Sequence, residues 1–317
     1  MEFLKAFYYL LLSRKIVLIN SPLQLINFNE FCFINEDFKN YNNKIFVGYT
    51  NSIAIEKIKK TKKKLKLKYK FFFLNEVINV KILHFIIKIR KILSLRFEEC
   101  LVGDIKYYLY EEFYKLSKKK YIVDDGTSSL GIKKLINNLN TSNTVLFTVY
   151  KTIKIRKIKI IQNDYNFLKT TYFNKKLKSK KEIHFISSKM NQYIKYPNTY
   201  YKVLRNLKRR YSKYKFIYFA HLHEDIRLIK KELNIVVIKH KLPIELYYAI
   251  NSILPKKIIF NYSSALFNIN RLFEDYKNTV NIGVKHKLHL LIDEHKSTYA
   301  KADDEIRFLK IKNQMLL

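Results

Sequence analysis

The sequence predicts an α/β protein with parallel sheets, and two observations support this prediction. Short runs rich in β-branched and aromatic residues recur along the chain, and most are apolar without alternation, as in strands buried on both faces. Helical patterns lie between several of them, at Val80–Leu95, Asp225–Leu233 and Ile244–Asn251. Repetition of strand, helix and strand is typical of the α/β class. The expected strands are Lys15–Asn20, Lys44–Tyr49, Tyr69–Leu74, Tyr121–Asp124, Val145–Val149, Glu182–Ser187, Lys215–Ala220, Ile235–Ile238, Lys257–Asn261 and Val280–Gly283.

The number of expected strands is large for one sheet, so we expect two Rossmann-like halves. Residues 151–180 begin with a dense run of Lys and Arg and continue without clear periodicity. We place an interdomain region in this stretch. The expected domains are therefore residues 1–150 and 181–317.

The composition excludes several classes of protein. With 48% hydrophobic and 28% charged residues, the chain can bury a core and is not a disordered polycation. Its two cysteines, Cys32 and Cys100, cannot form a disulfide framework, which suits a reducing compartment. The net charge of +36 attracts anions, whether nucleotide, nucleic acid or the anionic face of a membrane. Part of this charge reflects AT-rich codons, because Ile, Asn, Tyr and Phe are enriched together with Lys.

The most apolar segment is Phe3–Leu12, which is shorter than the roughly 18–20 residues that span a bilayer. Basic residues follow this run, whereas in a signal peptide they come first. Two interpretations remain open, an amphipathic anchor at a membrane interface and a first helix packed on the core. We therefore expect a cytoplasmic protein, either free or peripheral on the inner face of the cytoplasmic membrane.

Two of only five glycines follow an expected buried strand, in Asp124-Asp125-Gly126 and at Gly131. Ligand sites in α/β sheets lie at the carboxyl ends of strands, and a glycine there allows a tight turn. A carboxylate at this place can act as a general base, and two adjacent carboxylates raise each other's pKa. The alternative is a plain turn in which Asp125 caps the next helix.

A second group of polar residues, His221-Leu222-His223-Glu224-Asp225, also ends an apolar run. In an extended segment His221 and His223 point to the same side, so a metal site is one interpretation. However, zinc needs three or four ligands, and only His240 and the acidic pair lie near in the sequence. The other interpretations are surface histidines at a helix start, or a histidine that acts as an acid or binds phosphate.

Two further motifs could bind a nucleotide. Glu245 follows Pro243 in the first turn of an expected helix, where the helix dipole favours a carboxylate and where it could accept the ribose hydroxyls. Ser263 and Ser264 follow a strand and open an expected helix, where hydroxyls and free N–H groups bind phosphate or simply cap the helix.

In this order and spacing, with 24 residues from His221 to Glu245 and 18 from there to Ser263, the motifs resemble those of bacterial sialyltransferases. The resemblance is closest to glycosyltransferase family 52, the lipooligosaccharide and capsule sialyltransferases, which are related to bacterial polysialyltransferases. The segment from Ile16 to Gln24 also resembles the opening strand and loop of that family. Where the family often has His-Pro, this chain has His221-Leu222, which makes His223 a competing candidate.

This resemblance implies a GT-B fold, in which two Rossmann-like domains face a cleft. It implies metal-independent, inverting transfer of sialic acid from CMP-sialic acid to a terminal galactose, most commonly in α-2,3 linkage and without a cofactor. By the same resemblance Asp124 is the general base with Asp125 as the alternative, and His221 assists departure of the CMP phosphate. The expected substrate-binding residues are Ser21, Gln24, Gly126, His223, Glu245, Ser263 and Ser264.

Two alternatives from other classes stay open. One is a GT-B transferase that uses another nucleotide sugar, such as a UDP-linked sugar. The other is a basic nucleic-acid-binding protein, although no nucleic-acid-binding motif is present and the lysines are spread over nearly the whole chain. We expect a glycolipid or polysaccharide acceptor and no nucleic acid, and peripheral contact with an anionic membrane stays open. A homodimer is an open alternative to a monomer.

Overall fold

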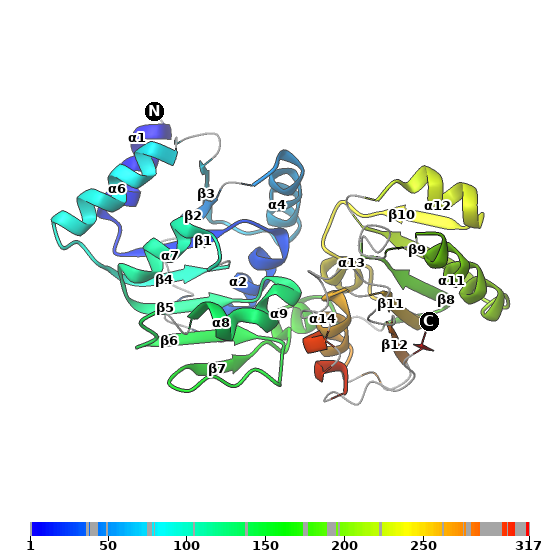
Figure 1. Ribbon diagram of the computed structural model, residues 1–317. Coiled ribbons are helices and arrows are strands. Elements are labelled where there is room, and N and C mark those ends of the chain that lie inside the picture. Colours follow the sequence, from blue (N-terminus) through cyan, green and yellow to red (C-terminus); the bar gives the residue numbers. More distant parts are fainter. Residues whose placement is uncertain are drawn as a thin grey trace. The chain divides into compact units, whose positions relative to one another are not determined.

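The computed structural model describes residues 2–35, 38, 44–48, 50–74, 78, 80–103, 105–136, 139–173, 177–188, 195, 197–221, 224–261, 263–274, 276, 280–285, 300–302, 304–307 and 315–316. The chain folds as two compact units. The first comprises Met1–Val149 and Ile153–Phe167, and the second comprises Tyr150–Thr152 and Leu168–Leu317. Each unit contains a parallel sheet with helices packed on it (Figure 1), so each is Rossmann-like.

The first unit is built on a seven-stranded parallel sheet with the order β3-β2-β1-β4-β5-β6-β7. The chain runs outward from β1 to β3, crosses back to β4, and then runs outward in the other direction. The strand order therefore reverses between β1 and β4, and in such sheets ligands bind outside the carboxyl ends of the strands at this point. The strands are β1 (Lys15–Ile19), β2 (Lys44–Val47), β3 (Lys70–Phe73), β4 (Phe97–Val102), β5 (Ser117–Val123), β6 (Thr144–Thr148) and β7 (Lys159–Gln162).

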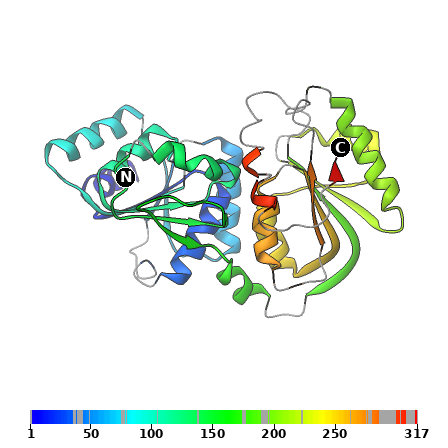
Figure 2. The same ribbon diagram turned by 60° about the horizontal axis from the view of Figure 1, so that its bottom comes forward.

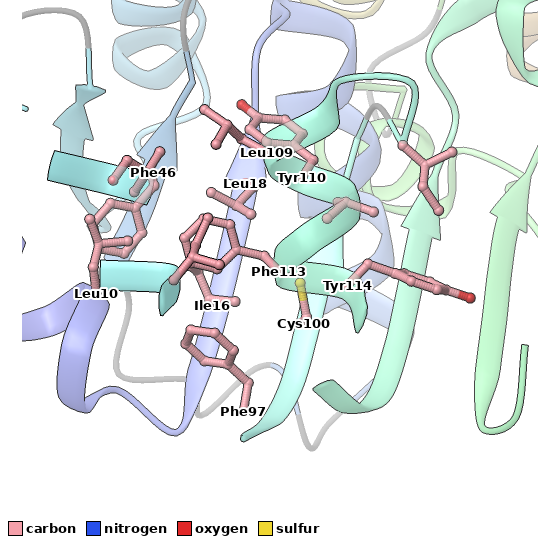
Figure 3. Packing of buried hydrophobic residues seen from close by; sticks show 14 of the residues in the cluster. Leu10, Ile16, Leu18, Phe46, Phe97, Cys100, Leu109, Tyr110, Phe113 and Tyr114 are labelled. Atoms are coloured by element: carbon pink, nitrogen blue, oxygen red, sulfur yellow. The ribbon is translucent and has the colours of Figure 1, made fainter. Parts of the chain in front are cut away.

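Helices cover both faces of the first sheet, because alternate residues of β1 enter two different cores. Ile16 and Leu18 pack with residues of α1 (Glu2–Leu12), α6 (Val80–Ile92), α7 (Tyr108–Lys115) and α8 (Ile132–Ile136), and Figure 3 shows part of this cluster. Val17 and Ile19 pack instead with α2 (Pro22–Ile34) and α4 (Ser52–Lys64). Burial on both faces explains why most of these strands contain continuous apolar runs.

Helix α1 is fastened to the first unit by one buried arginine. Ala6 and Leu10 of α1 are fully buried. Arg90 of α6, which is 2% exposed, donates to the carbonyl oxygens of Leu10, at 3.2 Å, and Leu11, and lies over the ring of Phe97. These carbonyls end α1 and lack partners within the helix, so the guanidinium caps it. No helix in the described parts of the chain has both the length and the hydrophobicity that crossing a bilayer requires.

The second unit is built on a sheet with the order β10-β9-β8-β11-β12-β13, in which all described pairs are parallel. Helices α11 (Pro197–Arg210) and α12 (Ile226–Leu233) pack on one face through an aromatic-rich core. On β8, His184 packs against Tyr248 of α13 (Ile244–Asn251); Figure 2 shows α14 (Ala265–Leu272), in orange, beside this sheet. The strands are β8 (Lys178–Ile186), β9 (Lys215–Ala220), β10 (Val236–Lys239), β11 (Ile253–Asn261), β12 (Val280–Lys285) and β13 (Met315–Leu316).

Each of the ten expected strands overlaps a strand of the structure, and the α/β class is confirmed. Strands β4, β7 and β13 were not expected. Strand β7 and helix α9 (Asn166–Tyr172) lie within residues 151–180, where the sequence suggested only an interdomain region. The reason is that β7 is a short edge strand, whose exposed first residue, Lys159, makes it look like part of the charge run.

Candidate active site

Asp124 lies directly after β5, at the carboxyl edge of the first sheet. It is 1% exposed, and its Oδ2 accepts a hydrogen bond of 2.6 Å from the backbone N–H of Val149, which follows β6. Burial raises the pKa of Asp124 to about 7, although the hydrogen bonds that it accepts favour the charged form. A carboxyl group with a pKa near neutrality can take up and release a proton under physiological conditions.

Asp125 has a different environment from its neighbour. It is half-buried, and its Oδ1 accepts a hydrogen bond of 2.7 Å from Nε2 of Gln24. Its backbone N–H donates to Oγ of Ser129 at 2.9 Å, within the 3₁₀ turn Gly126–Gly131. Gly126 opens this turn at a φ of 65°, a conformation that favours glycine. Of the two adjacent carboxyls before the turn, that of Asp124 is buried and that of Asp125 is half-buried.

Helix α2 presents polar side chains to the same edge of the sheet. Gln24, Asn27 and Glu30, spaced three residues apart, are each at most 1% exposed. Oε1 of Gln24 accepts from the N–H of Asn20 at 2.7 Å, and Nδ2 of Asn27 donates to the carbonyl oxygen of Asp124 at 3.1 Å. Ser21 caps the helix by accepting from the N–H of Gln24. The polar residues of α2 therefore hold the Asp124-Asp125 turn against β1.

Asn27 and Glu30 were missed in the sequence, although a signal was present. Both are polar residues in a mostly apolar helix, and with Gln24 they repeat at a spacing that places them on one face. Asn27 Oδ1 also accepts from Nδ2 of Asn163, at 3.0 Å, and from the hydroxyl of Tyr165. Such a buried hydrogen-bond network rigidifies the loops that it connects.

Gly103→Ala is expected to disturb this network. A Cβ at Gly103 would lie 2.2 Å from Cδ of Gln24, whose side chain is fully buried and must move. We expect loss of the bond from Gln24 to Asp125, a stability cost of about 1–2 kcal/mol from overpacking and at least about tenfold lower catalytic efficiency. Urea unfolding and kcat/KM measure the two effects.

Gly131→Ala is the matched control, because a Cβ there meets no atom within 4 Å. Equal losses in both variants would show that the contact with Gln24 is not the cause.

His221 lies at the carboxyl end of β9 in the second unit and is half-buried. Its backbone N–H donates to Oε2 of Glu224 at 2.7 Å. Glu224 is 4% exposed and its Oε1 also accepts from Oγ of Ser187 at 2.7 Å and from the hydroxyl of Tyr218 at 2.9 Å. Burial raises the pKa of Glu224, and these donors oppose the rise. Glu224 therefore sets the backbone position of His221.

The structure describes only part of the histidine motif. His223 lies outside the described residues. Among the residues that are described, no group of three or more His, Cys, Asp and Glu side chains could hold a metal ion.

Glu245 and the serine pair lie on the neighbouring helices α13 and α14. Glu245 is 4% exposed, its Oε1 accepts from Nδ2 of Asn268 at 2.6 Å, and burial raises its pKa. Ser264 is the N-cap of α14 but its side chain makes no capping bond, whereas Oγ of Ser263 accepts from the N–H of Ala265 at 3.3 Å. Because Asn268 is one turn after Ser264, it couples Glu245 to the helix that the serines open.

Within each unit the expected residues that the structure describes lie at the carboxyl ends of strands or in the segments that follow them. In the first unit, hydrogen bonds connect Ser21, Gln24 and Asp125, and Asp124 belongs to the same network through Asn27. In the second unit, His221 follows β9 and Ser263 follows β11, with β8 between these two strands. This edge is where parallel sheets bind nucleotides.

Two solved structures are similar to this chain over almost its whole length. One is an α/β-galactoside α-2,3-sialyltransferase from the luminous marine bacterium Photobacterium phosphoreum, with a TM-score of 0.54, 12% identity and coverage of 95% of this chain and 97% of that one. The other is the GT-B domain of a sialyltransferase from Photobacterium damselae, with a TM-score of 0.51, 12% identity and coverage of 96% and 99%. The chain has the GT-B fold.

No protein-family model matches the sequence, and no curated protein matches it. Membership of glycosyltransferase family 52 therefore stays a prediction. At 12% identity the likeness to the two GT-B structures concerns the fold, so the roles of individual residues must come from the geometry described above.

Proposed function

We propose that this GT-B protein is an inverting, metal-independent sialyltransferase that moves sialic acid from CMP-sialic acid to a terminal galactose. The observation that carries the proposal is Asp124, a carboxyl with a pKa of about 7 at the carboxyl edge of the first sheet. Two GT-B structures with a similar fold are sialyltransferases, which supports the choice of donor. The order and spacing of the motifs support it independently.

In the proposed reaction one displacement step transfers the sugar and inverts its anomeric carbon. Asp124 takes the proton of the acceptor hydroxyl as that oxygen attacks, and the bond between the sugar and the CMP phosphate breaks. Asp125, held by Gln24, orients the acceptor. His221 stabilises the departing phosphate, and Glu224 fixes its position. Asp124 removes the proton, and His221 stabilises the negative charge that develops on the phosphate, so the step needs no metal.

The nucleotide would bind to the second unit. Glu245 accepts the ribose hydroxyls, and Asn268 fixes the orientation of its carboxylate. Ser264 offers a hydroxyl that is not used for capping, and the start of α14 offers backbone N–H groups to the phosphate. We further propose a glycolipid or polysaccharide acceptor and a protein that works at the inner face of the cytoplasmic membrane.

The rate should depend on pH through Asp124. This group must be ionised to accept a proton, so we expect kcat/KM to rise tenfold per pH unit below about 7 and to level off above it. A profile measured from pH 5 to about 9 at saturating CMP-sialic acid, with buffers of constant ionic strength, checks this. A rate that is flat across pH 7 would contradict the role of Asp124.

The deciding experiment is a transfer assay with CMP-sialic acid and a panel of galactose-terminated acceptors. We expect transfer from CMP-sialic acid and none from UDP-linked sugars. Calorimetry with CMP and UDP tests the donor separately, and a preference for UDP would replace the proposal by another GT-B transferase. If no transfer is detected and the protein still binds nucleic acid after Asp124→Ala and His221→Ala, the non-enzymatic alternative is favoured.

A further inference from the structure

The large hydrophobic side chains that protrude most from the protein gather on one part of the first unit. In the described parts of the chain, every large hydrophobic residue that is more than half exposed lies on α1, on α6 and the turn after it, or at the start of α7. Helices α1 and α6 pack against each other (Figure 1). We call this surface the α1–α6 patch; it consists of Leu4, Tyr8, Leu12, Phe85, Ile92, Leu93 and Tyr108.

Helical spacing explains why these residues are left outside. Leu4, Tyr8 and Leu12 follow one another at intervals of four, so they lie on one face of α1, away from the buried Ala6 and Leu10. On α6, Phe85 and Ile92 are seven residues apart and share a face that differs from that of the buried residues. Helix α1 therefore has two apolar faces. One packs on the core, and the other is exposed.

The charges on these helices have one sign almost throughout. Helix α6 contains no acidic residue, and its Lys81 and Lys88 are exposed. Helix α1 carries the exposed Lys5 and, at its first position, Glu2. Exposed apolar residues flanked by lysines are the pattern of helices that lie in the interface of an anionic bilayer.

We propose that the α1–α6 patch docks on an anionic lipid bilayer. Its apolar side chains enter the boundary between headgroups and acyl chains, while Lys5 and Lys88 bind the lipid phosphates. A second copy of the chain is a poorer occupant, since a twofold interface would bring the lysines of both helices together with Glu2 as the one acidic residue that these helices contribute. Arg90 ties α1 to α6, so the two helices dock as one body.

This proposal is independent of the proposed transferase activity. A bilayer on this surface requires only that the first unit is folded.

The absence of tryptophan allows a direct test. Tyr8→Trp places a single fluorophore in the patch at a position that is 58% exposed, and Val236→Trp places one in the second unit at a position that is 45% exposed. Each variant is titrated with vesicles of pure phosphatidylcholine and with vesicles of equal parts phosphatidylglycerol and phosphatidylcholine. We expect the emission of Tyr8→Trp to shift to shorter wavelength with the anionic vesicles alone, and that of Val236→Trp to stay constant.

Three further double variants separate apolar insertion from general attraction by the +36 charge. Leu4→Ser with Ile92→Ser should weaken binding to the anionic vesicles by at least about tenfold, because two side chains no longer leave water. Lys5→Ala with Lys88→Ala should weaken it by roughly 25-fold, at about fivefold per lysine. Lys230→Ala with Lys231→Ala on α12 removes the same charge from the second unit and should have less than about a twofold effect.

The proposal is overturned if Val236→Trp shifts as much as Tyr8→Trp, or if the serine variant binds vesicles like the wild type. It is also overturned if light scattering shows that the wild type is a dimer and the serine variant a monomer, while no variant binds vesicles. A second copy of the chain would then occupy the patch. Thermal unfolding of every variant confirms that it is folded.

Discussion

Asp124→Asn is expected to lower kcat for sialic acid transfer by about 100- to 10,000-fold, the usual contribution of a general base. Asparagine has nearly the same shape, and its oxygen can still accept the hydrogen bond from the N–H of Val149. What it cannot do is take a proton from the acceptor hydroxyl. Initial rates with CMP-sialic acid and a galactose-terminated acceptor measure the loss.

Two control variants make this result specific. Asp125→Asn keeps an acceptor for Gln24 and should cost at most about tenfold, whereas the reverse ranking of the two variants would assign the base to Asp125. Asp304→Asn makes the same chemical change at an exposed position and should leave the rate unchanged. If Asp124→Asn has the activity of the wild type, Asp124 is not the general base and the proposed mechanism is wrong.

The same substitution should alter how stability depends on pH. The pKa of Asp124 is raised in the folded state from 3.8 to about 7, so the folded protein binds this proton more tightly than the unfolded chain does. Its contribution to stability is complete below pH 4 and is lost as the pH rises through about 7. Asparagine never ionises, so Asp124→Asn should gain stability relative to the wild type between pH 5 and 8, by up to about 4 kcal/mol in urea unfolding.

Glu224→Ala has the second large expected effect, and it acts on both stability and activity. Its carboxylate accepts hydrogen bonds from Ser187, Tyr218 and the N–H of His221, and all three donors would lose this acceptor inside the protein. Ser187 and Tyr218 keep hydrogen bonds to each other and to Tyr200, but the network loses the acceptor that it shares with His221. We expect a stability loss of about 3 kcal/mol, since removing one member of a buried hydrogen-bond network is costly. We also expect at least about tenfold lower kcat, because His221 is no longer held.

A conservative variant separates the effect on stability from the effect on activity. Glu224→Gln keeps an oxygen that can accept from Ser187 and Tyr218, so it should recover most of the stability. Glu98→Ala, which removes an exposed carboxylate paired with Lys118, should have a much smaller effect on both stability and activity. If Glu224→Ala unfolds at the same urea concentration as the wild type, the hydrogen-bond network does not support the second unit as described.

The parallel strands could be predicted from sequence where the residues form a continuous apolar run, and β4 was missed because charged residues interrupt its run. Strand β4 lies between β1 and β5 in the middle of the sheet, yet it begins Phe97-Glu98-Glu99. The charge of Glu99 is tolerated in this central strand because Nζ of Lys15 on β1 lies 2.8 Å from its Oε2. A partner more than eighty residues away cannot be recognised from a local pattern.

The candidate site was predicted as a set of motifs, and its supporting network was not. Asp124, Asp125 and Gly126 stand together in the sequence after a recognisable strand. Asn27 reaches the same turn only because α2 follows β1 and the sheet order brings β1 near β5. The pKa of Asp124 likewise depends on burial under the chain around Val149, which local composition does not encode.

The arginine that caps α1 has a consequence for biosynthesis. Leu10 and Arg90 are 80 residues apart, so α1 leaves the ribosome long before the residue that secures its end. During that interval both apolar faces of the nascent helix are exposed, because the core residues of α6 have not been made. We therefore expect the growing chain to be a client of co-translational chaperones until residue 97 has emerged, and shortening the chain before β4 should leave α1 sensitive to protease.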